Sequence, residues 1–447
     1  MRSPADLEHR LRAAAGAAPD TERALDGVMS RVWWRRRAVF ALAATILIMG
    51  GLATVWGVDR QASDDSAVFV GDPSSTSGLR IRELWRAQGV SGGSAPASGG
   101  RLITTIDDLV LAAEGFGPGR AEPTGRITGL ERGTGIMRWM VELGDPAFLQ
   151  GAAGGTAIAN TQYERIVGLD VADGTVRWEI ALSELGLDGY GAVTSAVTEP
   201  LTAIGLSANA VGDVRPPVIL GVDTRTGEVS WTTPLVGGTD LMWGVPSVSE
   251  GAAVFTSTLS NPGSAEENVA HLIRLADGSI GWTAGMGGSQ GFSDVPAVID
   301  PPYVHLPAHP DVLTVALADG SPHRARPGYG AVLVGEHLWT LKADGSLVMQ
   351  ESATGVVMGQ IASPVEQPRQ LLDLGEDLVG VVNRTQLAAL RADGEVVFTQ
   401  ALPSALADLA LFDRGLLLVA TQDHQVAAYA IETSSTQGEG SSSPLGD

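Results

Sequence analysis

The stretch ITGLERGTGIMRW, residues 127–139, contains the pattern that decides the fold. Alternating apolar residues come first, a Thr-Gly turn follows, and a second short strand carries a tryptophan. Glycine suits a tight hairpin turn because such a turn requires a positive φ. The pattern returns in IVGLDVADGTVRW (166–178), ILGVDTRTGEVSW (219–231) and LIRLADGSIGW (272–282). Short hairpins repeated at intervals of roughly 40–50 residues are typical of a β-propeller.

Counting the repeats predicts an eight-bladed ring. Beyond Trp282, degenerate copies without the tryptophan end at Arg324, Gly359 and Phe398. An eighth copy is implied by LRIRELW, which ends at Trp85 and has no strands before it, because two apolar strands without a partner stand at residues 415–421 and 425–431. If these N- and C-terminal strands share one blade, the ring closes without an exposed sheet edge at its joint. The 355 residues from 79 to 433 then give about 44 per blade.

The repeat resembles the pyrroloquinoline-quinone (PQQ) type, in which Thr-Gly, three residues and a tryptophan end each copy. The resemblance implies an all-β propeller in which each tryptophan docks between neighbouring blades. It further implies that the blade junctions at 324, 359 and 398 are packed differently, since they lack the ring. The structural docking residues expected on this basis are Trp85, Trp139, Trp178, Trp231 and Trp282.

Two functional classes share this repeat. Quinoprotein dehydrogenases hold PQQ and calcium over the propeller axis, whereas the lipoprotein propellers of outer-membrane protein assembly are non-catalytic. Dehydrogenases of this kind typically carry two adjacent cysteines beneath the cofactor, and this chain has no cysteine. We therefore expect no enzymatic activity, no cofactor and no catalytic residues, and keep a PQQ-dependent dehydrogenase as the alternative.

Charge separates the N-terminus from the rest of the chain. Residues 1–37 carry a net charge of +3, which leaves −25 for the remaining 410 residues. Nucleic-acid binding requires basic patches that neutralise phosphates, so an acidic body argues against a nucleic-acid partner.

A membrane anchor is expected at residues 38–58 (AVFALAATILIMGGLATVWGV), which are 21 residues without a charge. As a helix this segment is long enough to cross a hydrocarbon core of roughly 30 Å. Arg35, Arg36 and Arg37 precede it, so the N-terminus is predicted to be cytoplasmic and the propeller extracytoplasmic. The expected organisation is a partly helical cytoplasmic leader (1–37), the transmembrane helix (38–58), a flexible spacer (59–78), the propeller (79–433) and a disordered tail (434–447).

An aromatic residue recurs between the tryptophan position of one blade and the next apolar strand. Connections at this point of a propeller cross one face toward the axis, so these rings could bind the apolar groups of a peptide or stack on sugars at the channel mouth. The alternative is that they plug the channel and pack on each other. The candidate residues are Phe148, Tyr190, Trp243, Phe292 and Tyr329.

A metal site is not expected. His305, His309 and Asp311 lie close in sequence, but the intervening prolines prevent a helix that would align them, and we interpret the segment as a loop at a blade edge.

The sequence thus predicts a single-pass protein of the cell envelope whose propeller binds an envelope protein or peptide as a non-catalytic scaffold. A third possibility, that the leader couples an external binding event to a cytoplasmic partner, rests on topology alone.

The anchor prediction can be tested on the mature N-terminus. We expect protein purified from membranes to retain the leader, because the n-region and the apolar stretch are both too long for a typical signal peptide. Edman degradation or intact mass would detect cleavage, and a mature N-terminus near residue 60 would show that the segment is removed.

Overall fold

The computed structural model divides into two compact units, Met1–Ala67 and Val68–Asp447, and the residues it describes all lie in the second. The predicted leader, transmembrane segment, spacer and tail lie outside the described residues and stay predictions. No helix within the described part of the chain is long and apolar enough to span a membrane. The described ranges are 79–88, 101–114, 125–161, 165–208, 215–235, 242–249, 251–259, 267–286, 297–308, 311–328, 330–375, 377–391, 393–402, 406–412, 416–421 and 425–433.

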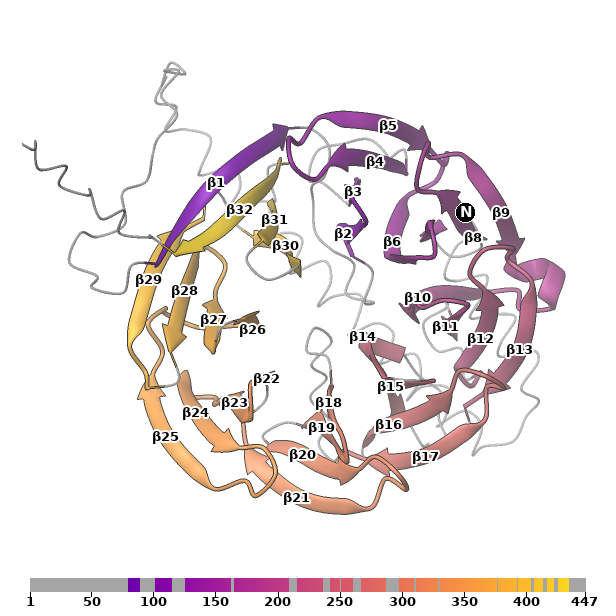
Figure 1. Ribbon diagram of the computed structural model, residues 1–447. Coiled ribbons are helices and arrows are strands. Elements are labelled where there is room, and N and C mark those ends of the chain that lie inside the picture. Colours follow the sequence, from indigo (N-terminus) through magenta and orange to yellow (C-terminus); the bar gives the residue numbers. More distant parts are fainter. Residues whose placement is uncertain are drawn as a thin grey trace, which may run out of the picture. The chain divides into compact units, whose positions relative to one another are not determined.

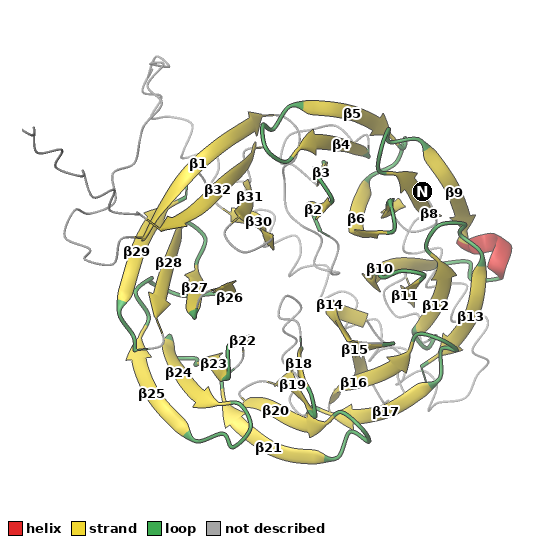
Figure 2. Cartoon of the chain, in the orientation of Figure 1, coloured by secondary structure: helices red, strands yellow, loops and turns green. Residues whose placement is uncertain are grey.

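Eight four-stranded antiparallel sheets form the ring, and in seven of them the strand nearest the axis comes first in the chain and the outermost comes last (Figures 1 and 2). Blades 1 to 4 consist of β2 (Ile103–Ile106), β3 (Leu109–Ala113), β4 (Arg126–Glu131), β5 (Met137–Glu142); β6 (Ala147–Ala153), β7 (Thr156–Thr161), β8 (Arg165–Asp170), β9 (Val176–Ala181); β10 (Tyr190–Ala196), β11 (Leu201–Ala208), β12 (Val218–Asp223), β13 (Val229–Pro234); and β14 (Met242–Ser249), β15 (Ala252–Leu259), β16 (Glu267–Arg274), β17 (Ile280–Gly285). A 3-10 helix, η1 (Leu182–Leu185), follows β9.

Blades 5 to 7 continue the same order. They consist of β18 (Val298–Asp300), β19 (Tyr303–Ala308), β20 (Asp311–Ala316), β21 (Pro322–Pro327); β22 (Gly330–Val334), β23 (His337–Leu341), β24 (Ser346–Glu351), β25 (Val357–Ala362); and β26 (Gln370–Gly375), β27 (Leu378–Val382), β28 (Gln386–Arg391), β29 (Val396–Ala401).

Blade 8 closes the ring as predicted. Its inner strands are β30 (Leu406–Phe412), β31 (Leu416–Thr421) and β32 (Gln425–Thr433), and its outer strand is the N-terminal β1 (Leu79–Gln88). β1 pairs with β32 from Leu79 opposite Thr433 to Gln88 opposite Gln425, so the two ends of the propeller are hydrogen-bonded to each other. The all-β, eight-bladed propeller with a shared closing blade is therefore confirmed.

The core is divided among the seams between blades. Buried apolar side chains form one cluster at each of seven seams; between blades 1 and 2, for instance, Leu111 and Trp139 pack against Leu149 and Val167. The other six clusters join blades 2 and 3, 3 and 4, 4 and 5, 6 and 7, 7 and 8, and 8 and 1. The described residues form no such cluster at the eighth seam, between blades 5 and 6.

Each tryptophan of the repeat lies on an outer strand and fills the gap to the next blade. Trp139 of β5 faces Gly129 of its own blade and Gly174 in the turn of blade 2. A Cβ atom placed on these glycines would lie only 2.4 Å and 2.5 Å from the indole ring. Gly174 also has a φ of +76°, which residues with a side chain rarely adopt. Both glycines are therefore needed to admit the ring.

A free carbonyl in the next blade's turn accepts the indole N–H. Because the Gly174 N–H donates to the Asp170 carbonyl, the Val171 carbonyl is left available, and Trp139 donates to it over 2.8 Å. The Val171 N–H donates to Gly155, which ties this turn to the hairpin between the first two strands of blade 2. The four other tryptophans make the same bond, from Trp85 to Arg132 (2.6 Å), Trp178 to Thr224 (3.2 Å), Trp231 to Leu275 (2.9 Å) and Trp282 to Leu317 (2.9 Å).

We predict that Trp139→Ala lowers the free energy of unfolding by about 3–5 kcal/mol, because it removes a large buried ring and leaves a cavity. Trp139→Phe keeps most of the ring but loses the bond to Val171, and we expect a cost nearer to that bond's net value, about 1 kcal/mol, plus the smaller ring. Denaturant unfolding of the two variants measures both. A loss in Trp139→Phe as large as that in Trp139→Ala would contradict this expectation, because the retained phenyl ring would then contribute nothing to stability.

Candidate functional site

The blades that lack the tryptophan form one continuous stretch of the ring, here called the irregular arc: the outer strands β21, β25 and β29. Their residues at the tryptophan position are Arg324, Gly359 and Phe398, opposite Thr314, Met349 and Ala389 of the neighbouring strand. The contacts made with the next blade differ at each of the three positions.

At the first position, two arginines replace one indole. Arg324 reaches the turn glycine of blade 6, Gly355, where a Cβ atom would lie 1.8 Å from its guanidinium. Arg326, two residues later on the same face of β21, donates from Nη2 to the Ser352 carbonyl over 2.7 Å. Ser352 stands three residues before Gly355, as Val171 stands before Gly174. The stacking and the hydrogen bond of a tryptophan are therefore divided between two side chains.

At the second position, the turn of the next blade is shorter. In blade 7 the turn glycine Gly394 donates to Arg391, only three residues earlier, so this turn is one residue shorter than those of blades 1 to 6. The blade before it has Gly359 in place of the tryptophan, and a Cβ atom on Gly359 would meet nothing within 4 Å. Ile361 packs on Gly394 instead, with a methyl carbon 3.0 Å from a Cβ atom placed there.

The outer strand β25 consequently presents an open apolar edge. Val356, Val357 and Met358 are 57%, 58% and 56% exposed, and residues 356–362 (VVMGQIA) contain no charge. Outer strands of a propeller have unpaired N–H and C=O groups along one side, and natural edges of this kind are often protected by charged side chains or prolines. Strand β25 contains no charged residue and no proline, which makes it a candidate surface for binding another chain.

The third position, Phe398, packs as a partly buried side chain against the cluster between blades 7 and 8. This is an apolar contact without a polar donor. The expectation that the three junctions differ from the others in their packing agrees with all three arrangements.

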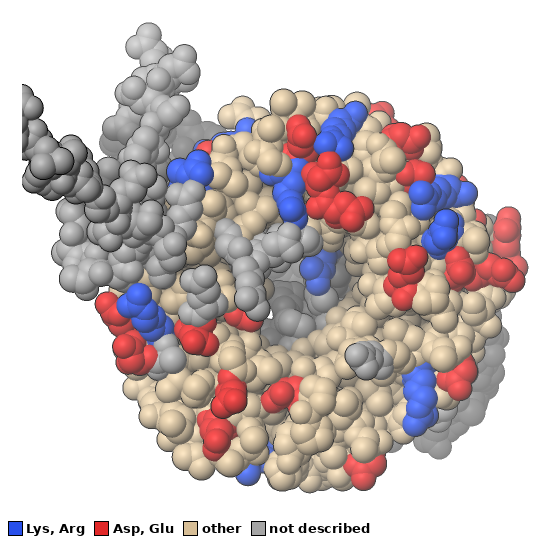
Figure 3. Space-filling view, in the orientation of Figure 1, with Lys and Arg blue, Asp and Glu red and all other residues tan. Residues whose placement is uncertain are grey.

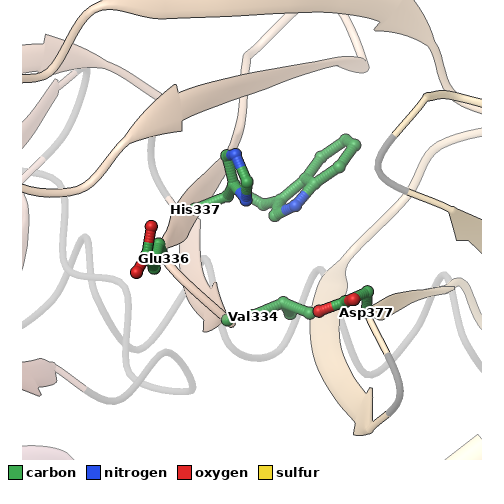
Figure 4. A pocket seen from close by; sticks show the side chains of 6 residues that line it. Val334, Glu336, His337 and Asp377 are labelled. Atoms are coloured by element: carbon green, nitrogen blue, oxygen red, sulfur yellow. The ribbon is translucent and has the colours of Figure 1, made fainter.

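A small cavity of about 250 Å³ lies between the inner hairpins of blades 6 and 7. It is lined by Val334, Glu336, His337 and Trp339 from blade 6 and by Asp377 from blade 7, and Figure 4 shows Val334 and Asp377 pointing toward one another across it. It opens beside two carboxylates. Carboxylates accept hydrogen bonds, so this lining suits a ligand that is a hydrogen-bond donor or a cation rather than an anion.

The predicted ring of aromatics is described in part. Phe148, in β6, and Tyr190, the first residue of β10, are 5% and 6% exposed. The Tyr190 hydroxyl donates to Pro216 over 2.9 Å, and the Arg215 guanidinium lies 4.5 Å above its ring. These are the contacts of packed side chains. Trp243 belongs to β14 but its side chain lies outside the described residues, as do Phe292 and Tyr329, so ligand binding by the set stays a prediction.

The histidine-rich segment forms a strand hairpin rather than the loop that we expected. His305 is fully buried in β19, and its Nδ1 lies 3.0 Å from Thr314 Oγ1. Asp311 begins β20, and His309 lies outside the described residues. Within the described ranges, no group of three or more histidine, aspartate or glutamate side chains is arranged to hold a metal ion.

A serine, a histidine and an aspartate do meet between blades 5 and 6, but not as a catalytic triad. Ser352 Oγ donates to the Asp300 carboxylate and lies 3.4 Å from His305 Nε2. In a triad the aspartate would hold the opposite histidine nitrogen, Nδ1, which here contacts Thr314. Ser352 is 4% exposed, so a substrate has little access to it.

The surface charge offers no basic platform on the face shown in Figure 3, where acidic and basic side chains are interspersed around the ring. Several pairs are ion pairs within one blade, such as Arg177 with Asp170 at 2.7 Å and Arg165 with Glu179 at 3.2 Å. Exposed pairs of this kind contribute little to stability but keep the surface soluble.

Comparison with known proteins places the fold. A family model described as "Outer membrane protein assembly factor BamB" matches residues 82–296. This chain contains a PQQ-like repeat β-propeller. The matched part of the PQQ-like propeller begins in β1 and ends before blade 5, so it holds all five docking tryptophans and none of the irregular arc.

Solved structures similar to the PQQ-like propeller come from proteins of different function. BamB from Moraxella catarrhalis is 13% identical, with a TM-score of 0.57 over 78% of this chain and 100% of that one. Quinohemoprotein alcohol dehydrogenase from Comamonas testosteroni is 10% identical, with a TM-score of 0.57 over 80% and 77%. The C-terminal WD40 domain of Sif2 is 10% identical, with a TM-score of 0.53 over 79% and 98%. At these identities the likeness shows the fold alone. The comparison with curated proteins gives no match.

Sequence reasoning found the irregular positions but missed Arg326 and the open edge of β25. Arg326 shares a strand face with Arg324, and this spacing of two residues was the available signal. Its importance depends on the turn carbonyl of the next blade, which no local pattern reveals.

Buried histidines give the PQQ-like propeller a predicted pH dependence. Burial lowers the pKa of His271 from 6.5 to about 4, and its ring lies 3.0 Å from both Ser257 Oγ and Thr283 Oγ1. Because the unfolded chain binds this proton more readily, stability falls as the pH drops from about 6.5 toward 4. We expect His271 to account for a loss of roughly 2 kcal/mol between pH 7 and pH 5. Denaturant unfolding of His271→Gln at the two pH values checks this: the variant should lose less stability than the wild type, and an identical loss would contradict the assignment.

Proposed function

We propose that this protein is a non-catalytic scaffold of the cell envelope, anchored by residues 38–58, whose extracytoplasmic propeller binds a protein or peptide partner. The observation that carries the proposal is the outer edge of β25, where three adjacent apolar side chains are more than half exposed beside the open position at Gly359. The family model matched by residues 82–296 is that of an assembly factor, which supports a binding role over a catalytic one.

The mode of binding that fits this edge is strand addition. An extended segment of the partner pairs with the unpaired backbone of β25, and its apolar side chains cover Val357 and Met358. The backbone supplies hydrogen bonds without regard to sequence, whereas the exposed side chains select apolar partners. The absence of charge from residues 356–362 removes the usual barrier to such pairing.

The absence of cysteine from the chain allows a direct test. Met358→Cys carrying a photoreactive maleimide should form a defined cross-linked product in native membranes. A matched position is Met140→Cys, whose residue is 49% exposed on β5, a strand fixed by Trp139. We expect the product from position 358 and not from position 140, detected as a shifted band and identified by mass spectrometry.

A second substitution separates specific pairing from chance proximity. Val357→Lys in the Met358→Cys background should abolish the product, because it places a charge in the edge. The thermal midpoint of the protein should change little, because Val357 is exposed. Equal products from both cysteine positions, or a product insensitive to Val357→Lys, would refute binding at β25.

A further inference from the structure

We infer that the seam between blades 5 and 6 binds a small inorganic anion of the size of chloride. This seam is the one at which the described residues form no apolar cluster. Several polar residues are buried at this seam: His305 and Thr314 are 0% exposed, Gln350 is 1% exposed and Arg326 is 2% exposed. A seam of this composition requires a hydrogen-bond partner for each buried polar group.

Several of these groups have no partner in the protein. Arg326 uses Nη2 for the Ser352 carbonyl, but its Nε and Nη1 are buried without a hydrogen bond. Arg324 Nη1 and Gln350 Nε2 are in the same state. All four atoms are N–H donors, and donors without acceptors call for a group that accepts several hydrogen bonds. Leaving a charged donor buried without a partner costs more than leaving a neutral one.

The strand register places these donors in one seam. Arg324 and Arg326 alternate on the face of β21 that meets blade 6, as shown by the contacts of Arg324 with Gly355 and of Arg326 with Ser352. Gln350 belongs to β24, which ends at Glu351, and successive side chains along a strand point to opposite sides. The odd-numbered residues Leu347 and Met349 belong to the cluster with blade 7, so Gln350 points toward blade 5.

The charge of the seam favours an anion over a water molecule. Arg324 and Arg326 bring two positive charges, and the opposing charge that acts on Arg326 is the single carboxylate of Asp300. That carboxylate already accepts a hydrogen bond from Ser352. Desolvation and the neighbouring Arg324 lower the pKa of Arg326, so repulsion between the two arginines outweighs the attraction of Asp300. Water satisfies donors but leaves this excess positive charge uncompensated.

The site differs from the surface proposed for partner binding. Its donors lie inside the ring wall and the edge of β25 lies outside, so an anion here acts on the joint between two blades. It would perform the task that an indole and its apolar neighbours perform at the other seams, which is to hold one blade against the next.

The test measures the thermal midpoint of the full-length protein in detergent at constant ionic strength. Replacing sodium gluconate, whose anion is too large for a closed seam, by sodium chloride should raise the midpoint by about 2 °C at a chloride concentration ten times the dissociation constant. Arg326→Met and Gln350→Leu should each remove this response. Arg391→Met should keep it, because Arg391 is an exposed arginine paired with Glu395.

Crystallography of the wild-type protein tests the site without relying on a variant that could fail to fold. Bromide soaked into crystals of the wild-type protein should give an anomalous peak beside Arg326 and Gln350. The inference is overturned if the wild type shows no chloride-specific rise, if the rise persists in Arg326→Met, or if bromide leaves the seam empty. None of these outcomes depends on whether β25 binds a partner.

Discussion

The propeller depends on one repeated hydrogen bond. In it, a tryptophan indole on the outer strand of one blade donates to a turn carbonyl of the next blade. The bond exists because the turn glycine of the acceptor blade bonds four residues back and leaves a carbonyl free, as Gly174 does for Val171. The same turn is bound through its Val171 N–H to the inner hairpin of its blade. A single contact therefore links the outer rim of one blade to the outer and inner turns of the next, and repeating it aligns successive blades.

The exceptions follow from the same constraint. Blade 6 keeps the long turn and its free Ser352 carbonyl, and the preceding blade, although it lacks tryptophan, still provides an N–H from Arg326. Blade 7 has the shorter turn, its Arg391 carbonyl is used within the turn, and the preceding blade offers Gly359. Blade 6, with the long turn, thus receives a polar donor from the blade before it, whereas blade 7, with the short turn, faces a glycine.

How far the sequence predicts this structure depends on how local each feature is. The repeat, its eight copies and the shared closing blade could be read from the chain because each copy carries its own strand, turn and tryptophan, and because β1 lacked partners that the C-terminus supplied. The segment around His305 was misread as a loop because its prolines suggested a break, whereas both histidine and proline are accommodated in the hairpin of β19 and β20. The role of Arg326 could not be predicted, since it depends on a carbonyl 26 residues away in another blade.

The irregular arc occupies consecutive blades of the ring. In a closed ring each blade is held from both sides, and blades 1 to 4 and blade 8 retain every indole contact made by the repeat. The blades without tryptophan are consecutive, and the pairing of β1 with β32 in blade 8 still closes the ring. Exposed apolar side chains on β25 would be a liability in a ring without such support, because an edge that binds a partner can also bind a misfolded neighbour. The family model ends at residue 296, ahead of this arc. The regular blades thus carry the repeat that the family model matches, whereas the arc contains the blades in which the repeat lacks its tryptophan.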